Sequence, residues 1–176
     1  NDGTPESLLL VSAGNVDNND GVGYPDYLWN NSVNDPAQSW NALTVGAFTE
    51  KIVISDVEYE GRQIVAPHGG VSPFSRTSRL WDNNMLIKPE ILMEGGNAYW
   101  DGGGYFQCHD DLMLVTTDAQ DYCTFSAFNA TSAATALAGR LACALNHYNP
   151  ARCALSIRAL MAPSPTWTAA MRSICT

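Results

Sequence analysis

The stretch Asn129-Ala130-Thr131-Ser132-Ala133-Ala134-Thr135-Ala136-Leu137-Ala138-Gly139 decides how the rest of the chain is interpreted. It places a serine directly before a run of small residues in which leucines recur four apart, and this spacing predicts a helix over residues 133 to about 147. Nearly every face of that helix is apolar, so we expect it to be buried. Ser132 would lie at the positive end of the helix dipole, where backbone N–H groups are unpaired. Such a position suits a nucleophile whose reaction passes through an oxyanion.

A second stretch, Leu8-Leu9-Leu10-Val11-Ser12-Ala13-Gly14-Asn15, begins with a short apolar run bounded by glycine. This pattern predicts a buried parallel strand that ends in Gly14-Asn15. Both stretches also have simpler interpretations. A Thr-Ser pair that opens a helix is often only an N-cap, and Gly-Asn after a strand is ordinary turn chemistry.

Together these stretches resemble the C-terminal part of a subtilisin-like serine peptidase, in a divergent bacterial branch of that family. The family nucleophile lies in a Gly-Thr-Ser-Met-Ala-(Ser/Thr)-Pro-His-Val-Ala-Gly segment, and the asparagine of an Ala-Gly-Asn segment supplies an oxyanion-hole side chain. The resemblance therefore implies that Ser132 is the catalytic nucleophile and Asn15 the oxyanion donor. Two further stretches agree with the family and follow in the right order, Ser39 to Ala47 and then Phe74-Ser75-Arg76-Thr77 with Lys88-Pro89-Glu90-Ile91.

The chain also departs from the family pattern. Ala130 stands where the family has glycine, and the Pro-His pair inside the nucleophile helix is missing. The family's Asp-Ser/Thr-Gly and His-Gly-Thr-His motifs do not occur here. We therefore expect the chain to hold half of an active site, with the triad aspartate and histidine on a segment upstream. None of His68, His109 and His147 has the family context, although distance in sequence does not prevent one of them from serving as the base.

The resemblance implies an α/β fold, namely a subtilisin-like three-layer fold with a mostly parallel sheet, of which this chain is the C-terminal half. We expect one domain over residues 1–176. The pattern predicts a buried strand at 42–48, another short apolar strand at 87–94, and a hairpin within 51–66 that turns at Glu60-Gly61. A second hairpin, with arms at 112–117 and 123–128, would deliver Ser132 to its place. Loops are expected at 16–38 and 67–84, and further helices at 151–161 and 167–174.

Composition narrows the possible functions. The net charge of −9 argues against nucleic acid and anionic membranes as partners, and no run reaches the roughly 18 apolar residues of a membrane span. The five cysteines form no Cys-x-x-Cys pair, which argues against a zinc or redox site. An odd number of cysteines favours reduced thiols and a cytoplasmic protein, with a Cys108–Cys123 bridge as one alternative and secretion of a processed fragment as another.

Bound groups and partners follow mainly from the resemblance. No cofactor is expected. Asp17-Asn18-Asn19-Asp20-Gly21 is rich in oxygen ligands, but its glycine is one place early for an EF-hand loop, so a solvated turn is favoured over calcium. The expected partners are a peptide or protein substrate and the N-terminal half of the same catalytic domain. The resemblance places Gly95-Gly96-Asn97 beside the pocket for the residue before the scissile bond.

The function expected is that of a serine endopeptidase that hydrolyses peptide bonds through an acyl-enzyme on Ser132. The alternative is a non-catalytic, protease-derived fragment that binds a peptide or a partner chain, and the absent aspartate and histidine motivate it. A third possibility is an unrelated α/β domain in which Ser132 only caps a helix.

Overall fold

The computed structural model describes residues 7–16, 23–82, 85–119 and 124–148. Four of the sequence predictions lie outside these residues. They are the helices at 151–161 and 167–174, the oxygen-rich turn at 17–21, and the Cys108–Cys123 bridge, because Cys123 is not described.

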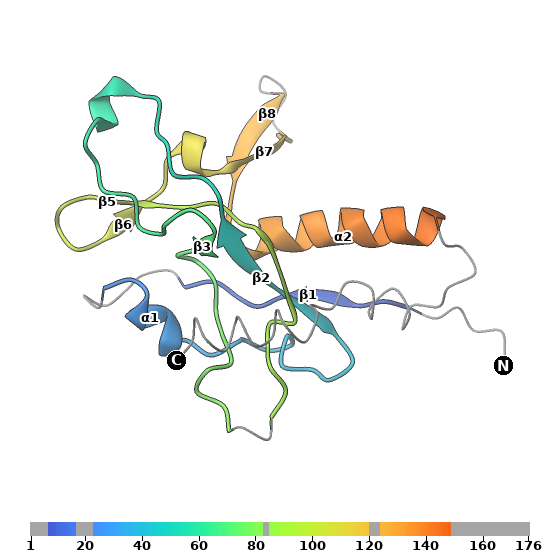
Figure 1. Ribbon diagram of the computed structural model, residues 1–176. Coiled ribbons are helices and arrows are strands. Elements are labelled where there is room, and N and C mark those ends of the chain that lie inside the picture. The colour runs from blue at the N-terminus through green and yellow to red at the C-terminus, as the bar shows by residue number, and fades with distance from the viewer. Residues whose placement is uncertain (1–6, 17–22, 83–84, 120–123, 149–176) are drawn as a thin grey trace, which may run out of the picture.

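The centre of the fold is a small sheet in which three strands run parallel (Figure 1). Strand β2 (Leu43–Thr49) lies between β1 (Leu10–Ser12) and β4 (Ile91–Glu94), and β3 (Gly70–Val71) pairs antiparallel with the end of β2. Every residue of β2 except Phe48 is buried, which explains why this strand reads as a continuous apolar run. The predictions of an α/β fold, of a mostly parallel sheet and of strands near 8–13, 42–48 and 87–94 are confirmed, but β1, which was predicted to be buried, is only half-buried along its length.

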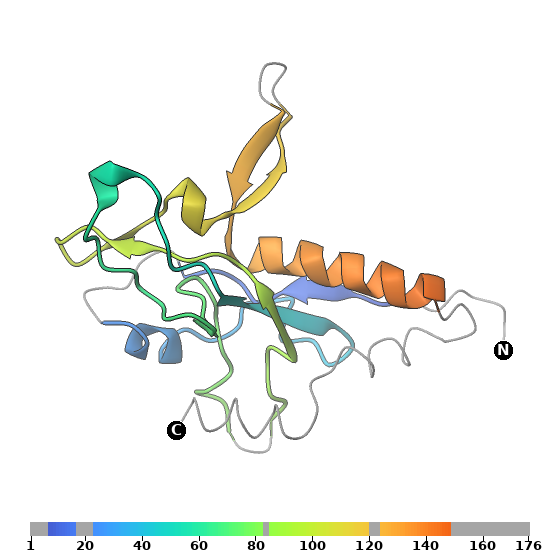
Figure 2. The ribbon, with the colours of Figure 1, turned by 45° about the horizontal axis from the view of Figure 1, so that its top comes forward.

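Helix α2 (Ala130–Tyr148) lies across β1, β2 and β4 (Figure 2). Its Ala134 and Ala138 join Leu43, Val45, Ala47 and Ile91 in one buried cluster. Alanine at these positions allows the helix backbone to approach the sheet closely. The small residues of the stretch 129–139 therefore determine how closely α2 packs on the sheet.

Two details of α2 differ from the sequence prediction. The helix begins at Ala130, so Ser132 lies in its first turn and not directly before it. The helix is also buried on one face only, since Leu141 is 40% exposed and Tyr148 is 80% exposed. The sequence pattern counts leucine and alanine as apolar whether or not another element covers them. For this reason it overestimated how much of α2 is buried.

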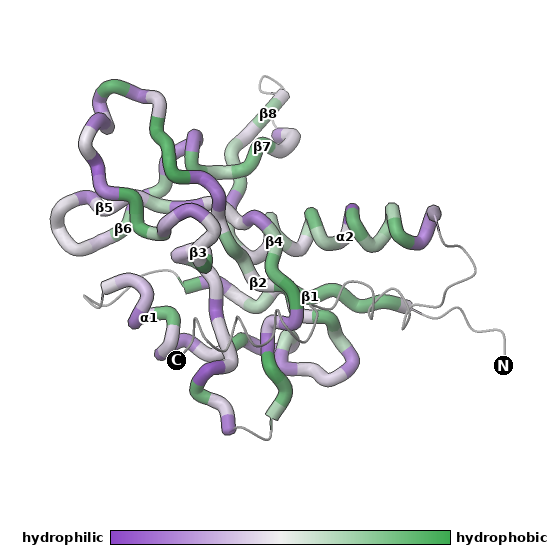
Figure 3. The backbone as a smooth tube through the Cα atoms, in the orientation of Figure 1, coloured by the Kyte–Doolittle hydropathy of each residue, from purple (hydrophilic) through white to green (hydrophobic). Residues whose placement is uncertain are grey.

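The hairpin predicted within residues 51–66 is wrong, because no two strands pair there. The segment instead contains a short 3₁₀ helix, η1 (Val57–Tyr59), and only Ile64 forms a β-bridge, with Tyr99. The predicted turn does exist, since Gly61 has a φ of +79°. The alternating apolar residues do not share one buried face, since Ile52 and Val57 are 41% and 79% exposed whereas Ile54, Tyr59 and Ile64 are half-buried. Figure 3 shows that this protruding segment mixes apolar and polar residues.

The loop predicted at 16–38 contains one short helix, α1 (Asp26–Trp29), which buries Tyr27 and Leu28. The predicted hairpin before the nucleophile segment is confirmed. Its strands are β7 (Leu114–Thr117) and β8 (Phe125–Phe128), and it projects away from the body beside the start of α2 (Figure 2). A smaller hairpin, β5 (Tyr99–Trp100) with β6 (Phe106–Gln107), precedes η2 (Asp110–Leu112). No helix in the described part of the chain is both long and apolar enough to cross a membrane.

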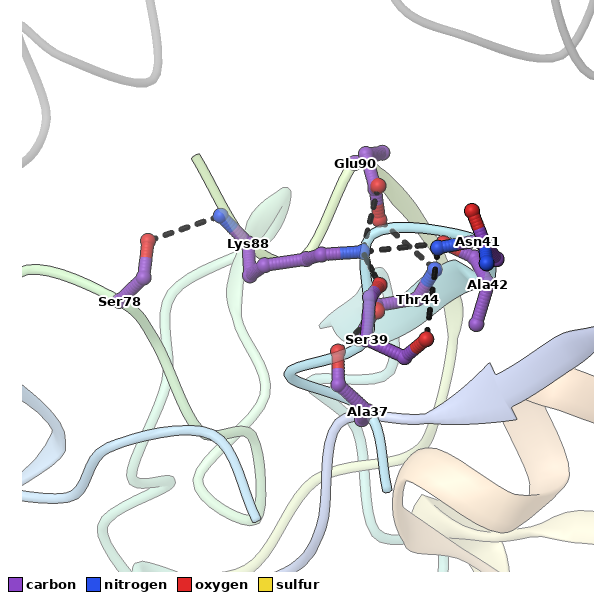
Figure 4. Close-up of polar contacts among 8 residues, drawn as sticks. All are labelled: Ala37, Ser39, Asn41, Ala42, Thr44, Ser78, Lys88 and Glu90. Carbon is purple, nitrogen blue, oxygen red and sulfur yellow. Dashed lines mark hydrogen bonds and ion pairs between the residues drawn. The ribbon is translucent and has the colours of Figure 1, made fainter. Parts of the chain in front are cut away.

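A buried lysine joins the start of β4 to the turn that precedes β2 (Figure 4). The ammonium group of Lys88 donates to the carbonyls of Ser39 and Ala42, both at 2.9 Å, and pairs with the Glu90 carboxylate at 2.6 Å. The other carboxylate oxygen of Glu90 accepts from the Thr44 N–H at 2.7 Å. The Lys-Pro-Glu stretch, quoted above for its family likeness, thus holds together the two strands that carry the core.

Candidate active site

Asn15 lies where the chain leaves β1. The preceding Gly14 has a φ of +93°, a conformation that glycine adopts without strain, and the chain turns there. Asn15 forms an antiparallel bridge with Ser75, and the next N–H, of Val16, donates to the Phe74 carbonyl at 2.9 Å. The residues around 75 thus hold the exit of β1 in place.

The side chain of Asn15 is fixed against the beginning of α2. Its Oδ1 accepts two hydrogen bonds from Thr131, one from the hydroxyl at 2.6 Å and one from the backbone N–H at 3.1 Å. The carbonyl end of the amide is therefore directed at the helix terminus, and its NH₂ end must face the other way. Among the described residues no acceptor takes a hydrogen bond from Asn15 Nδ2. These hydrogen bonds join Asn15 and Thr131, which are 116 residues apart in the sequence.

Ser132 follows directly after Thr131 and is exposed. It lies in the first turn of α2, where backbone N–H groups have no partner within the helix. The helix cap comes from Asn15, whose Oδ1 accepts the Thr131 N–H, and not from the Ser132 hydroxyl. Asn15 and Ser132 are thus brought to the same helix end, with the serine hydroxyl at the surface.

The turn that leads into α2 is tight. Ala130 has a φ of +68°, in the left-handed region, and its N–H donates to the Gly95 carbonyl at 2.7 Å. A Cβ on Gly95 would lie 2.4 Å from Ala47 Cβ and 3.0 Å from the Ala130 oxygen, so only glycine fits. The glycine pair after β4 therefore lets two backbones meet beside the start of α2. That places Gly95 next to the segment that bears Ser132.

The described residues place no histidine in hydrogen-bond contact with Ser132. His68 is exposed in a loop. His109 caps η2, since its Nδ1 accepts from the Asp111 N–H at 3.1 Å, and its ring lies 4.6 Å from that of Tyr59. His147 is exposed in the last turn of α2, where a positive charge would favour the helix dipole.

Two free cysteines, Cys108 and Cys143, fall in the described part, and both are exposed. Although the residue is exposed, partial desolvation raises the pKa of the Cys108 thiol, and a hydrogen bond from Asn129 Nδ2 to its sulfur, at 3.2 Å, acts in the opposite direction. Within the described residues no group of three histidine, cysteine or carboxylate side chains could hold a metal ion.

Two residues of the site were not predicted as such from the sequence. Thr131 holds the Asn15 amide, and Arg76 donates from Nε to the Asn15 carbonyl at 2.8 Å. Both stand in stretches that were quoted for their likeness to the family, but the pairing of distant segments is not visible in a sequence. The only feature of the sequence that could have drawn attention to Thr131 was its position next to Ser132.

The comparison with family models matches this geometry to a known family. The model of the subtilase family matches residues 1–169, so the chain belongs to the subtilase family. The resemblance derived from the sequence is confirmed, and the origin of the chain is that of a serine peptidase. The same match excludes the third possibility, an unrelated α/β domain. Comparisons with curated proteins and with solved structures found no match.

Proposed function

We propose that this chain is the part of a serine endopeptidase domain that supplies the nucleophile, Ser132, and an oxyanion donor, Asn15. The observation that carries the proposal is the pair of hydrogen bonds from Thr131 to Asn15 Oδ1, at 2.6 and 3.1 Å. They leave the NH₂ end of the amide with no acceptor among the described residues, so we take it as the group that donates to the oxyanion formed at the exposed Ser132, the residue after Thr131. An oxyanion hole needs such fixed donors, because they then cost no reorganisation during the reaction.

In the proposed reaction Ser132 Oγ attacks the carbonyl carbon of the scissile peptide bond, and a base takes the hydroxyl proton. The tetrahedral oxyanion accepts hydrogen bonds from Asn15 Nδ2 and the Ser132 backbone N–H. Its collapse breaks the C–N bond, and the amine leaves with the proton that the base returns. Water then hydrolyses the acyl-enzyme by the same route.

The proposal assigns the base and its orienting aspartate to the N-terminal half of the same catalytic domain, on a segment upstream. The described residues offer Ser132 no histidine, and this is why a partner segment is part of the proposal. The substrate is a peptide or protein chain, bound by strand addition as extended peptides often are. No cofactor, nucleic acid or membrane takes part, and calcium and a cytoplasmic location stay predictions.

The alternative is a peptide- or partner-binding protein of protease origin that has lost catalysis. The missing Pro-His pair in the nucleophile helix and the absence of a contacting histidine among the described residues favour it. A probe that reacts only with an activated serine separates the two functions.

The experiment is fluorophosphonate labelling of this chain and of Ser132→Ala, each with and without the segment encoded upstream. Ser126→Ala is the matched control, because Ser126 is an exposed serine on the neighbouring β8. Labelling that disappears in Ser132→Ala and persists in Ser126→Ala would support the peptidase, and a requirement for the upstream segment would place the base there. Silence with the upstream segment present would favour the binding protein.

A further inference from the structure

The segment 74–77 lies between the exit of β1 and a second loop, and hydrogen bonds join it to both. On one side Asn15 bridges to Ser75. On the other side Ser32 bridges to Thr77, and the Val33 N–H donates to the Thr77 carbonyl at 3.1 Å. Segment 74–77 therefore connects Asn15 to residues 31–33 through two isolated bridges.

Arg76 spans the same two sides with its side chain. Its Nε donates to the Asn15 carbonyl at 2.8 Å, and a terminal guanidinium nitrogen donates to the Ser32 carbonyl at 3.1 Å. The side chain is half-buried, and in the described part of the chain no carboxylate lies within ion-pair distance of it. A rigid guanidinium fork holds two separate carbonyls in a fixed geometry, whereas the ammonium of a lysine is a compact charge on a flexible stem.

We infer that Arg76 is a positioning residue for the oxyanion donor, an inference that rests on the proposed function. Besides its bridge to Ser75, Asn15 is held by two side-chain contacts: its Oδ1 accepts from Thr131, and its backbone carbonyl accepts from Arg76. The glycine that precedes Asn15 has no side chain to resist rotation at this point. Arg76 thus fixes the backbone from which the Asn15 amide reaches the beginning of α2.

The inference predicts a loss in turnover more than in substrate binding. Removing an oxyanion donor outright costs about 10²–10³ in kcat in a subtilisin, which sets the upper bound. A donor that is displaced but present should cost less. We therefore expect Arg76→Gln to lower kcat by about 10- to 100-fold with KM within about twofold of its original value, measured on a peptide substrate in the preparation that labels at Ser132.

Arg79→Gln is the matched control. Arg79 lies three residues further along, and its guanidinium lies over the Trp29 ring at 4.8 Å, with no contact to Asn15. We expect this variant to keep kcat within about twofold. Arg76→Lys retains the charge but not the fork, and it should fall between the two; it also replaces Arg76→Gln if that variant does not fold. Equal kcat in the Arg76 and Arg79 variants would overturn the inference, as would an effect on KM alone.

A second measurement does not depend on activity. If Arg76 holds Asn15, the Thr131 N–H loses its acceptor more often in Arg76→Gln, and its hydrogen exchange should accelerate about tenfold or more while that of Ala138 in the helix core stays unchanged. Unchanged Thr131 exchange would refute the positioning role. Failure of the proposed function would instead appear as an absence of Ser132-dependent labelling in the unaltered protein, whatever Thr131 exchange shows.

Discussion

Replacing Lys88 by methionine tests whether the buried lysine holds the two core strands together. Methionine keeps most of the apolar stem and removes only the charged end. The Lys88 side chain has 0% exposure, and its three N–H donors reach the Ser39 and Ala42 carbonyls and the Glu90 carboxylate. The substitution therefore removes three hydrogen bonds in a buried place, among them the ion pair with the Glu90 carboxylate.

The magnitude follows from what is left behind. Breaking a buried ion pair by removing one partner costs about 3–5 kcal/mol. Glu90 is 18% exposed, so water can reach part of its carboxylate, and this places the expectation near the lower end, at about 3–4 kcal/mol. Lys88→Met/Glu90→Gln also removes the negative charge that Lys88 neutralised, and it keeps an oxygen for the Thr44 N–H. We expect it to be more stable than Lys88→Met by about 1–2 kcal/mol, a coupling typical of contacting residues.

The assay is urea unfolding at neutral pH, followed by circular dichroism and tryptophan fluorescence, with the free energy of unfolding extrapolated to water. Lys51→Met is the matched control, because that lysine is half-buried and no ion pair is found for it among the described residues. A loss below about 1 kcal/mol in Lys88→Met would refute the reasoning. So would a double variant less stable than Lys88→Met, since the charge of Glu90 would then not be the source of the cost.

Two further predictions concern other parts of the fold. Gly95→Ala should destabilise the protein by about 1–3 kcal/mol in the same assay, because the new Cβ would lie 2.4 Å from Ala47 Cβ, whereas Gly23→Ala, which meets nothing within 4 Å, should be nearly neutral. Burial raises the pKa of Tyr24 to about 12 from 10, so its phenol stays protonated in the folded state where it would ionise in the unfolded one. Stability should be full below pH 10 and fall as the pH rises to 12, and a thermal melting temperature that stays constant over this range would contradict this.

Much of the fold could be predicted because the relevant signals are local. The buried strand β2 is a continuous apolar run, and the alanines of α2 follow a helical spacing, so both elements follow from periodicity. The hairpin expected within 51–66 failed because alternation shows only that one face of a strand could be buried. Whether a core exists for that face is a tertiary property, and here Ile52 and Val57 are exposed.

In the candidate site, too, the residues with a local sequence signal could be predicted and those defined by distant contacts could not. Ser132 and Asn15 were found because each stands in a recognisable local stretch. Arg76 and Thr131 could not be assigned a role, since their contacts with Asn15 join segments 61 and 116 residues apart. Pairings of this kind depend on how the strands are ordered in the sheet.

The alanine at position 130, the main local departure from the family pattern, has a physical account. Its φ of +68° costs an alanine about 1–2 kcal/mol relative to the right-handed region, which is why glycine is favoured at such a turn. The Ala130 methyl, however, is buried with Val65, Phe74 and Ala98. Burial of one methyl group contributes about 0.8 kcal/mol, and avoiding the backbone entropy of glycine contributes about 0.5–1 kcal/mol. The two sides nearly cancel, so the turn before Ser132 can be kept with either residue, and the departure at Ala130 is no argument against the proposed site.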